Sequence, residues 1–393
     1  MIITCFRLAL EELCRIWRDK SVFSLMIIAG LFYIAFYPQP YLNEATRDIP
    51  IIVIDHDQSI SSQKLLLLID ASEGAKIVAR ADNLASAKAQ LLARKAYGIV
   101  LIPHYFEREI LAGRASPVAL YGDGNYFLIY GKLAAGVGGA VATMGGDISL
   151  KRLVAQGLDP VAAMGLAVPL QSSQVALFNP QGGYATYVLP AAFILIMQQT
   201  LWMGVGLLWK SRTRNRYEIA LREDYGSSFL IILITTLSKI FSYMTLYGFF
   251  FWLYTIVVPS WYNIPQLGAV WDLFLVSIPL LLSICLLGII ISYLLPSREA
   301  VVLLISPLGM ILFFLSGISW PHEAMPDFIR YISYVFPTTA GIDAVVRINQ
   351  MGATVANLRF ELGVLWVLVM IYGSIAMLLA YKDSLTQTQL EKS

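Results

Sequence analysis

Charged residues are scarce in this chain. Asp, Glu, Lys and Arg make up 14% of its 393 residues, whereas hydrophobic residues make up 58%. Soluble domains carry about 25% charged residues, so the composition excludes an ordinary soluble protein and is typical of a membrane protein. The formal net charge is only +2, and we expect no nucleic-acid partner.

Cysteine and histidine are also rare. The three cysteines all lie outside segment 40–180, so that polar segment has no disulfide framework. The three histidines, His56, His104 and His322, are far apart in the sequence and show no H-E-x-x-H or other paired spacing. We interpret them as solvated or hydrogen-bonding loop residues and expect no metal site.

Motifs for catalysis and nucleotide binding are missing as well. No G-x-x-x-x-G-K-[ST] sequence occurs, and "GVGGAV" follows a predicted helix rather than the strand that a dinucleotide site needs. The run "DHDQS" (55–59) has two interpretations, a metal or catalytic cluster or polar caps at the end of a strand, and the caps are favoured. We expect no catalytic residue and no cofactor bound by this chain.

Long apolar runs, in contrast, are abundant. A helix needs about 20 mostly apolar residues to cross a bilayer. Six stretches meet or approach that length: 21–38, 184–209, 228–258, 270–295, 299–317 and 362–381. The sequence therefore predicts an α-helical polytopic membrane protein with six transmembrane helices, five of them within 184–381.

The distribution of basic residues predicts the orientation. Four basic residues precede the first span and five follow the second, whereas the connection "PSWYNIPQLG" (259–268) has none. Because positively charged connections stay in the cytoplasm, both termini and the tail 382–393 are predicted to be cytoplasmic, and segment 40–180 extracytoplasmic. No small-x-small cleavage site follows the first run, which we interpret as an uncleaved anchor.

The first 20 residues have the pattern of an interfacial helix. Apolar residues recur at helical spacing: Ile2, Phe6, Leu10, Leu13, Ile16 and Trp17. Charged residues, Glu12 and Arg15 among them, occupy the other side. We expect residues 1–20 to form an amphipathic helix on the cytoplasmic surface of the membrane.

Residues 40–180 have the composition of a soluble domain. Predicted strands "IPIIVID", "AKIVAR", "YGIVLIP" and "PVALYGDG" alternate with helices "SSQKLLLLIDASE", "DNLASAKAQLLARKA" and "HYFEREILAGR". Ser61 or Ser62 is the expected N-cap of the first helix, and Asp82 or Asn83 that of the second. This alternation predicts an extracytoplasmic α/β domain with a partly parallel sheet, followed by a long helix rich in small residues.

The cytoplasmic connection 210–227 contains a short amphipathic pattern. Its members are Tyr217, Glu218, Leu221, Arg222 and Glu223. Two interpretations stay open for these residues. They form a helix that docks into a partner's groove, or they belong to a positive-inside anchor, which explains the arginines but not the interleaved acids.

Residues 318–345 are too polar for a span and too apolar for an ordinary loop. Pro321, Pro326 and Pro337 limit helices to short pieces, so "DFIRYISYVF" (327–336) is too short to cross the membrane. The favoured interpretation is a re-entrant segment that dips into the outer leaflet. The alternative is an amphipathic surface loop.

Ionisable residues are scarce within the spans. Lys239 lies in the third, and Asp272 and Glu299 lie near span ends. A carrier driven by protons or sodium usually needs carboxylates at mid-depth, and no such relay is visible. Lys239 has two open interpretations, local pairing or snorkelling, and a role in substrate binding.

Three stretches carry a family resemblance. The segment 315–353 contains Ser316-Gly317, Pro321, Met325-Pro326, Pro337-Thr338 and Arg347. This pattern is similar to the segment between the fifth and sixth spans of the type-2 ABC-transporter permease family. "RDIPIIVIDHDQSISSQKLLLLID" and "AYGIVLIPHYFEREILAGR" resemble the extracytoplasmic domain of the subgroup with a large loop after its first span. "NRYEIALREDYGSSFLIILITTLSKIF" resembles the family's cytoplasmic loop and third span.

The resemblance implies a dimer in the bacterial inner membrane, formed with a second copy or a paralogue. Each copy would contact a cytoplasmic ABC ATPase that holds ATP and Mg, and the first helix and residues 217–227 would receive its motion. The resemblance also implies an exit segment that includes Gly317, Pro321, Pro326, Pro337 and Thr338.

The expected function is therefore the permease subunit of an ATP-driven exporter for a hydrophobic or amphipathic substrate. A periplasmic membrane-fusion adaptor and membrane lipids are expected as further partners. Two other functions stay open. One is a cation-coupled secondary transporter, which needs a carboxylate in a span. The other is an envelope receptor that does not transport and acts through the α/β domain. The substrate-binding residues are not predicted, because the apolar side chains that would line such a site form no recognisable sequence motif.

Overall fold

The structure, a computed structural model, describes residues 2–41, 46–168, 177–179, 182–210 and 229–390. The chain divides into two compact units. The first consists of Met1–Glu44 and Ala176–Ser393, and the second of Ala45–Val175. The first unit is a bundle of long helices, and the second is built around a four-stranded sheet.

Within its described residues, the first unit has six helical stretches long and apolar enough to cross a membrane. They are Lys20–Tyr41, Tyr184–Trp209, Phe229–Trp261, Val270–Leu294, Arg298–Leu315 and Arg359–Ser384. Each overlaps one of the six predicted spans. The chain is thus a polytopic helical membrane protein.

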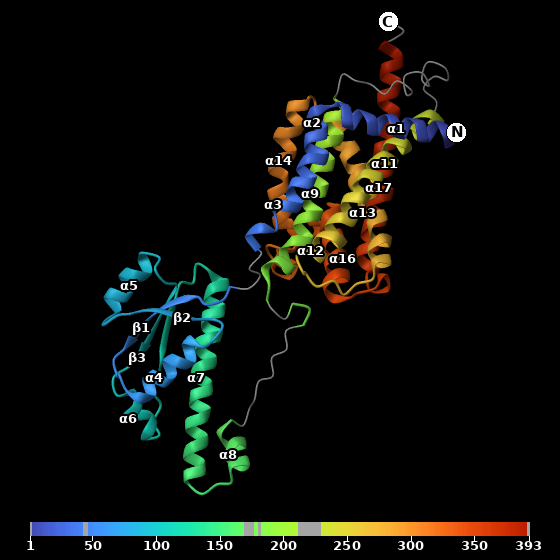
Figure 1. Ribbon diagram of the computed structural model, residues 1–393. Coiled ribbons are helices and arrows are strands. Elements are labelled where there is room, and N and C mark those ends of the chain that lie inside the picture. Colours follow the sequence, from blue (N-terminus) through green and yellow to red (C-terminus); the bar gives the residue numbers. More distant parts are fainter. Residues whose placement is uncertain (1, 42–45, 169–176, 180–181, 211–228, 391–393) are drawn as a thin grey trace. The chain divides into compact units, whose positions relative to one another are not determined.

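These stretches contain the following elements. The first comprises α2 (Lys20–Phe23), η1 (Ser24–Ile28), α3 (Ala29–Phe36) and η2 (Gln39–Tyr41). The second is α9 (Tyr184–Trp209), and the third comprises α11 (Phe229–Trp252), η3 (Leu253–Val257) and α12 (Val258–Trp261). The last three are α13 (Val270–Leu294), α14 (Arg298–Leu315) and α17 (Arg359–Leu390). Helix α1 (Ile2–Arg18) lies across one end of the bundle, and α16 (Pro337–Met351) lies at the other (Figure 1).

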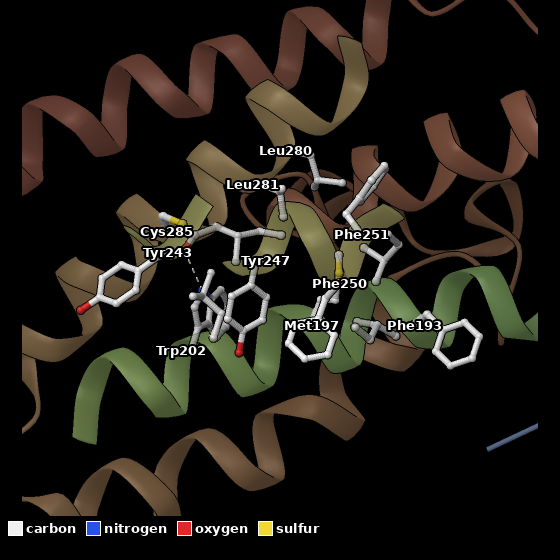
Figure 2. Packing of buried hydrophobic residues seen from close by; sticks show 14 of the residues in the cluster. Phe193, Met197, Trp202, Tyr243, Tyr247, Phe250, Phe251, Leu280, Leu281 and Cys285 are labelled. Carbon is white, nitrogen blue, oxygen red and sulfur yellow. Dashed lines mark hydrogen bonds between the residues drawn. The ribbon is translucent and has the colours of Figure 1, made fainter. Parts of the chain in front are cut away.

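Helix α9 forms the centre of the bundle. It packs against α13, α14 and α16, and its residues are almost all buried. Trp202 shows why α9 and α13 fit closely: its indole N–H donates to the Ile284 carbonyl at 3.0 Å. A Cβ at Gly288 would lie 3.0 Å from that indole, so a glycine leaves room for the ring. Figure 2 shows Trp202 beside Tyr247 in this core.

The second unit contains a sheet with strand order β2-β1-β3-β4. The strands are β1 (Pro50–Asp55), β2 (Lys76–Arg80), β3 (Gly98–Ile102) and β4 (Ala119–Gly122). Strand β1 pairs in parallel with both β2 and β3, whereas β4 is antiparallel to β3. Each strand lies where the sequence predicts one, and the sheet is partly parallel as expected.

The described part of the second unit also contains five helices: α4 (Ile60–Asp70), α5 (Leu84–Leu92), α6 (Phe106–Leu111), α7 (Phe127–Ala155) and α8 (Pro160–Ala167). Side chains of α4, α6 and α7 share a core with Ile51 and Val53. Helix α5 packs with Ile52 and Ile54. Because alternate residues of a strand point to opposite faces, α4 and α5 cover opposite sides of the sheet.

Of the two predicted helix N-caps in this unit, one is confirmed and the other is wrong. Asn83 caps α5, as expected, by accepting from the Ser86 N–H at 2.9 Å. The prediction for α4 was wrong, because its N-cap is Ser59 rather than Ser61 or Ser62. The hydroxyl of Ser62 instead donates to Asp55 at 2.7 Å. That of Ser61 donates to Glu107 at 2.8 Å.

Helix α7 adds a seventh candidate span. It has 29 residues, and most of its apolar surface is exposed. Length and composition therefore give seven candidates among the described residues, not the six predicted. One face of α7 packs on the sheet through Leu133, Val137 and Met144. We still predict that α7 belongs to a domain outside the membrane.

Candidate coupling and exit elements

At one end of the bundle, α1 is fastened to α11 through a buried carboxylate. The Tyr243 hydroxyl donates to Oε1 of Glu12 at 2.7 Å, and the Arg15 guanidinium donates to Oε2 at 2.6 Å. Glu12 and Tyr243 are both buried. Figure 2 shows the Tyr243 hydroxyl pointing away from the other labelled aromatic side chains. Glu12 lies opposite the exposed apolar side of α1, but it is buried: both of its oxygens have partners, and the pairing offsets the cost of burial.

Further bonds tie α1 to other spans. The Ser242 hydroxyl donates to the Ala9 carbonyl at 2.9 Å. Arg15 also donates to the Leu208 carbonyl of α9 at 3.1 Å. The carboxylate of Asp19, the N-cap of α2, forms an ion pair with Arg298 at the start of α14, 3.0 Å away. A displacement of α1 would therefore be transmitted through these bonds to α9, α11 and α14.

The opposite side of α1 is apolar and exposed. Ile3, Phe6, Leu10 and Trp17 lie on it, which is the pattern of a helix that rests on a membrane surface. Ile16, predicted for the same side, is buried in the bundle core instead.

Lys239 has an aromatic partner nearby. Its Nζ lies 4.5 Å from the ring centroid of Trp209, at the end of α9. A cation over an indole face is attracted by the negative charge of the ring. Trp209 in turn packs edge-on against Tyr293 of α13. This geometry favours local pairing among the interpretations of Lys239.

The predicted coupling residues Tyr217, Glu218, Leu221, Arg222 and Glu223 lie outside the described residues. Their role stays a prediction.

At the other end of the bundle, the predicted exit segment consists of short elements. Gly317 follows α14 with a φ of +84°, a backbone conformation that favours glycine. Pro321 precedes η4 (His322–Ala324), and Pro326 precedes α15 (Asp327–Ser333). Pro337 is the first residue of α16, where a proline needs no hydrogen bond from its nitrogen.

Helix α16 is inserted among the spans. It packs against α9, α13 and α17. Its polar side chains bond to span backbones: Asn349 donates to the Thr255 carbonyl at 3.1 Å, and Gln350 donates to the Thr186 carbonyl. Thr338 is also buried, and its hydroxyl has no hydrogen-bond partner within the described part of the chain.

Arg347 links α16 to the start of α17. Its guanidinium lies 2.7 Å from Glu361 and 3.6 Å from Asp343, and it donates to the Asn357 carbonyl of η5 (Val355–Asn357) at 3.1 Å. Desolvation, together with a hydrogen bond to Glu361 and the charge of that group, raises the pKa of Asp343 to about 6. Arg347 opposes this shift.

Helix α15 presents apolar side chains outward. Phe328 and Tyr331 are 74% and 68% exposed, although both are large aromatics. Asp327 and Arg330 form an ion pair 2.6 Å apart on the same helix. The combination fits a helix in contact with lipid at its apolar side.

One of the three histidines, His322, differs from the expectation of a solvated or hydrogen-bonding loop residue. His322 is not solvated: both ring nitrogens are buried, and the ring stacks on Tyr334 at a centroid distance of 5.9 Å. Burial lowers the pKa of His322. His56 and His104, 48 positions apart, stack on each other at 4.6 Å. Among the described residues, no group of three or more His, Cys, Asp or Glu is placed to hold a metal ion.

A family model of the ABC-2 family transporter proteins matches residues 20–378. The chain belongs to the ABC-2 transporter family. No curated protein matches it. As an ABC-2 permease, the chain is a membrane component of an ABC transporter rather than its catalytic subunit, and the family implies an ABC ATPase as partner.

Sequence reasoning missed the Glu12–Tyr243 pair, although a signal was available. Leu8, Glu12 and Ile16 recur every fourth residue, so they share one helix face. All three are buried. An acidic residue between two apolar ones at this spacing could have indicated a buried carboxylate with a partner.

Proposed function

We propose that this ABC-2 permease is the membrane subunit of an ATP-driven exporter. It works as a dimer with six spans per copy, both termini in the cytoplasm and the second unit outside. It moves a hydrophobic or amphipathic substrate out of the cytoplasm or the inner membrane. ATP and Mg are held by the partner ATPase.

The observation that carries this proposal is the attachment of α1. A partner that moves α1 acts at once on α11 through Glu12 and Tyr243, on α9 through Arg15, and on α14 through the Asp19–Arg298 pair. Together with residues 217–223, α1 would form the receiving surface for the ATPase. Buried hydrogen-bonded pairs suit the transmission of motion. Separating such a pair would leave a buried polar group without a partner, so its two helices tend to move together.

The exit is proposed at the opposite end, where α15 and α16 form the re-entrant segment. The segment includes Gly317, Pro321, Pro326, Pro337 and Thr338. Non-helical backbone at membrane depth is tolerated only against protein or a water-filled cavity. Helix α16 supplies such a protein surface, since its polar side chains bond to span carbonyls. The second unit is proposed to receive substrate or to contact a membrane-fusion adaptor.

The test is transport in vesicles. The permease is reconstituted with an ABC ATPase subunit, and uptake of a fluorescent amphipathic probe into inside-out vesicles is followed with and without ATP. We expect ATP-dependent uptake that disappears when the Walker lysine of the ATPase is replaced. Uptake that persists without ATP and without the second subunit would overturn the proposal. Dependence on a proton or sodium gradient instead of ATP would favour a secondary transporter.

A further inference from the structure

The second unit has a topological switch point at the carboxyl ends of β1 and β3. The chain leaves β1 through α4 toward β2 on one side and returns through α5 to β3 on the other. The two helices cover opposite faces of the sheet. In parallel α/β sheets, ligands bind in the crevice that this reversal opens beyond the carboxyl ends of the strands.

Two histidines meet at this edge. His56 directly follows β1, and its backbone N–H donates to the Ile102 backbone carbonyl at 3.1 Å. The segments after β1 and β3 therefore start side by side. His104 is the second residue after β3. Their rings lie 4.6 Å apart with an interplanar angle of 13°.

The backbone at this edge is strained on both sides. Gln58, two residues after His56, has a φ of +51°, and Tyr105, next to His104, has a φ of +63°. Residues other than glycine rarely adopt this conformation, and such strain gathers at functional sites. Each imidazole therefore belongs to a segment that contains a residue in an energetically unfavourable backbone conformation.

The surrounding charges favour a cation over an anion. Three carboxylates are close to the histidines along the chain: Asp55 and Asp57 flank His56, and Glu107 is three residues after His104. Each accepts hydrogen bonds from neighbouring groups. The cation Arg108, four residues after His104, lies over the Tyr105 ring at 4.1 Å and also bonds to Glu109. The carboxylates therefore set the sign of the local field without being free ligands themselves.

We propose that His56 and His104 form a two-histidine site for a divalent transition-metal ion of the Zn²⁺, Ni²⁺ or Cu²⁺ class. Imidazole is a preferred ligand of these ions. Metal–nitrogen bonds of about 2.0–2.1 Å place two ligating nitrogens about 3.4 Å apart in a tetrahedral site. The rings stack almost parallel, 4.6 Å apart, so the exposed His104 side chain must rotate to point its lone pair at the ion that His56 binds. Water or an external ligand fills the remaining positions. This site goes beyond the proposed transport function and does not depend on it.

The experiment uses the full chain, purified in detergent without a polyhistidine tag. The background carries Cys5→Ala and Cys14→Ala, which remove the half-buried and the exposed thiol and leave the buried Cys285. Binding of Zn²⁺ and Cu²⁺ is measured by calorimetry. We expect one site per chain that weakens by at least about tenfold in both His56→Gln and His104→Gln. His322→Gln is the matched control, since it removes the remaining histidine, and should bind as the parent does.

A second readout separates ligation from folding. The electron paramagnetic resonance spectrum of bound Cu²⁺ should show splitting from two imidazole nitrogens in the parent and lose it in either variant. Far-UV circular dichroism checks that both variants remain folded. Equal affinity in the parent and in both variants, or loss of the site in His322→Gln instead, would overturn the assignment.

Discussion

The hydroxyl of Tyr243 donates to the carboxylate of Glu12 at 2.7 Å, although the two residues are 231 positions apart. This bond connects the N-terminal helix to α11 inside the protein rather than at its surface. Arg15 completes the cluster and adds a bond to α9. The cluster makes α1 part of the bundle, with only its other side left for the membrane.

Replacing Tyr243 with Phe should destabilise the permease. The variant leaves Oε1 of Glu12 buried without its donor, and losing a partner of a buried polar group costs about 1–3 kcal/mol. We expect a lower thermal unfolding temperature in detergent, measured by intrinsic fluorescence. In Tyr381→Phe, which removes a hydroxyl from an exposed residue of α17, the temperature should stay unchanged. If the two variants unfold alike, the bond contributes nothing to stability.

Replacing Gly268 with Ala should disturb the docking of α16. A Cβ at this position would lie 2.3 Å from the Ile348 carbonyl oxygen, which belongs to the backbone and cannot rotate away. Overpacking of this kind costs about 1–3 kcal/mol. The same substitution at Gly363 has open space around the new methyl group and serves as the control. Thermal unfolding should separate the two variants, and equal stability would contradict the tight contact.

The Arg347–Glu361 pair is predicted to hold α16 to α17. Glu361 is buried, so Arg347→Ala would leave its carboxylate without the closest cation, and breaking a buried pair costs about 3–5 kcal/mol. We expect less than this upper range, because Arg347 is itself about one-third exposed. A double-mutant cycle with Glu361→Gln measures the coupling energy. Additive effects of the two substitutions would show that the residues act independently.

The membrane part of the fold was readable because its signal is local. A run of about 20 apolar residues has few alternatives in a bilayer, and each predicted span overlaps a helix of the first unit. The strands of the second unit were equally visible, since "IIVI" and "GIVLI" are short runs rich in β-branched residues, and a proline or an aspartate ends each of them. In both cases the physical cause lies within a few consecutive residues.

The candidate sites were less readable because they join distant segments. Nothing near Glu12 in the sequence indicates Tyr243, and nothing near His56 indicates His104. The strand order places the histidines together, and helix packing places the carboxylate beside the tyrosine. By length and composition alone, α7 also qualifies as a candidate span, since a helix that packs one apolar face on a sheet can be as apolar as one that crosses lipid.

Stability should depend on pH through Asp343. Its pKa is raised from 3.8 to about 6 in the folded chain, by desolvation first and then by Glu361. A raised carboxyl pKa means that the folded state prefers the neutral form. Relative to Asp343→Asn, the parent should therefore lose stability as pH rises from 3.8 to about 6 and change no further above that. Thermal unfolding temperatures of the parent and of Asp343→Asn, measured across this pH range, test the direction of this change in stability. A parent that gains stability relative to the variant over the same interval would contradict it.

Cysteine labelling should decide whether α15 is re-entrant. Asp327 and Phe328 are adjacent and almost equally exposed within the protein, 76% for the Asp327 side chain and 74% for Phe328. Packing within one copy of the chain therefore covers both positions equally, and we attribute a difference in their reactivity to lipid. In a background with all three native cysteines replaced by alanine, we expect Asp327→Cys to react quickly with a bulky, charged maleimide in intact membranes. Phe328→Cys and Ile332→Cys should react slowly with it but readily after detergent solubilisation, since lipid would no longer cover them. Equal, rapid labelling of all three in the intact membrane would make α15 part of an ordinary surface loop.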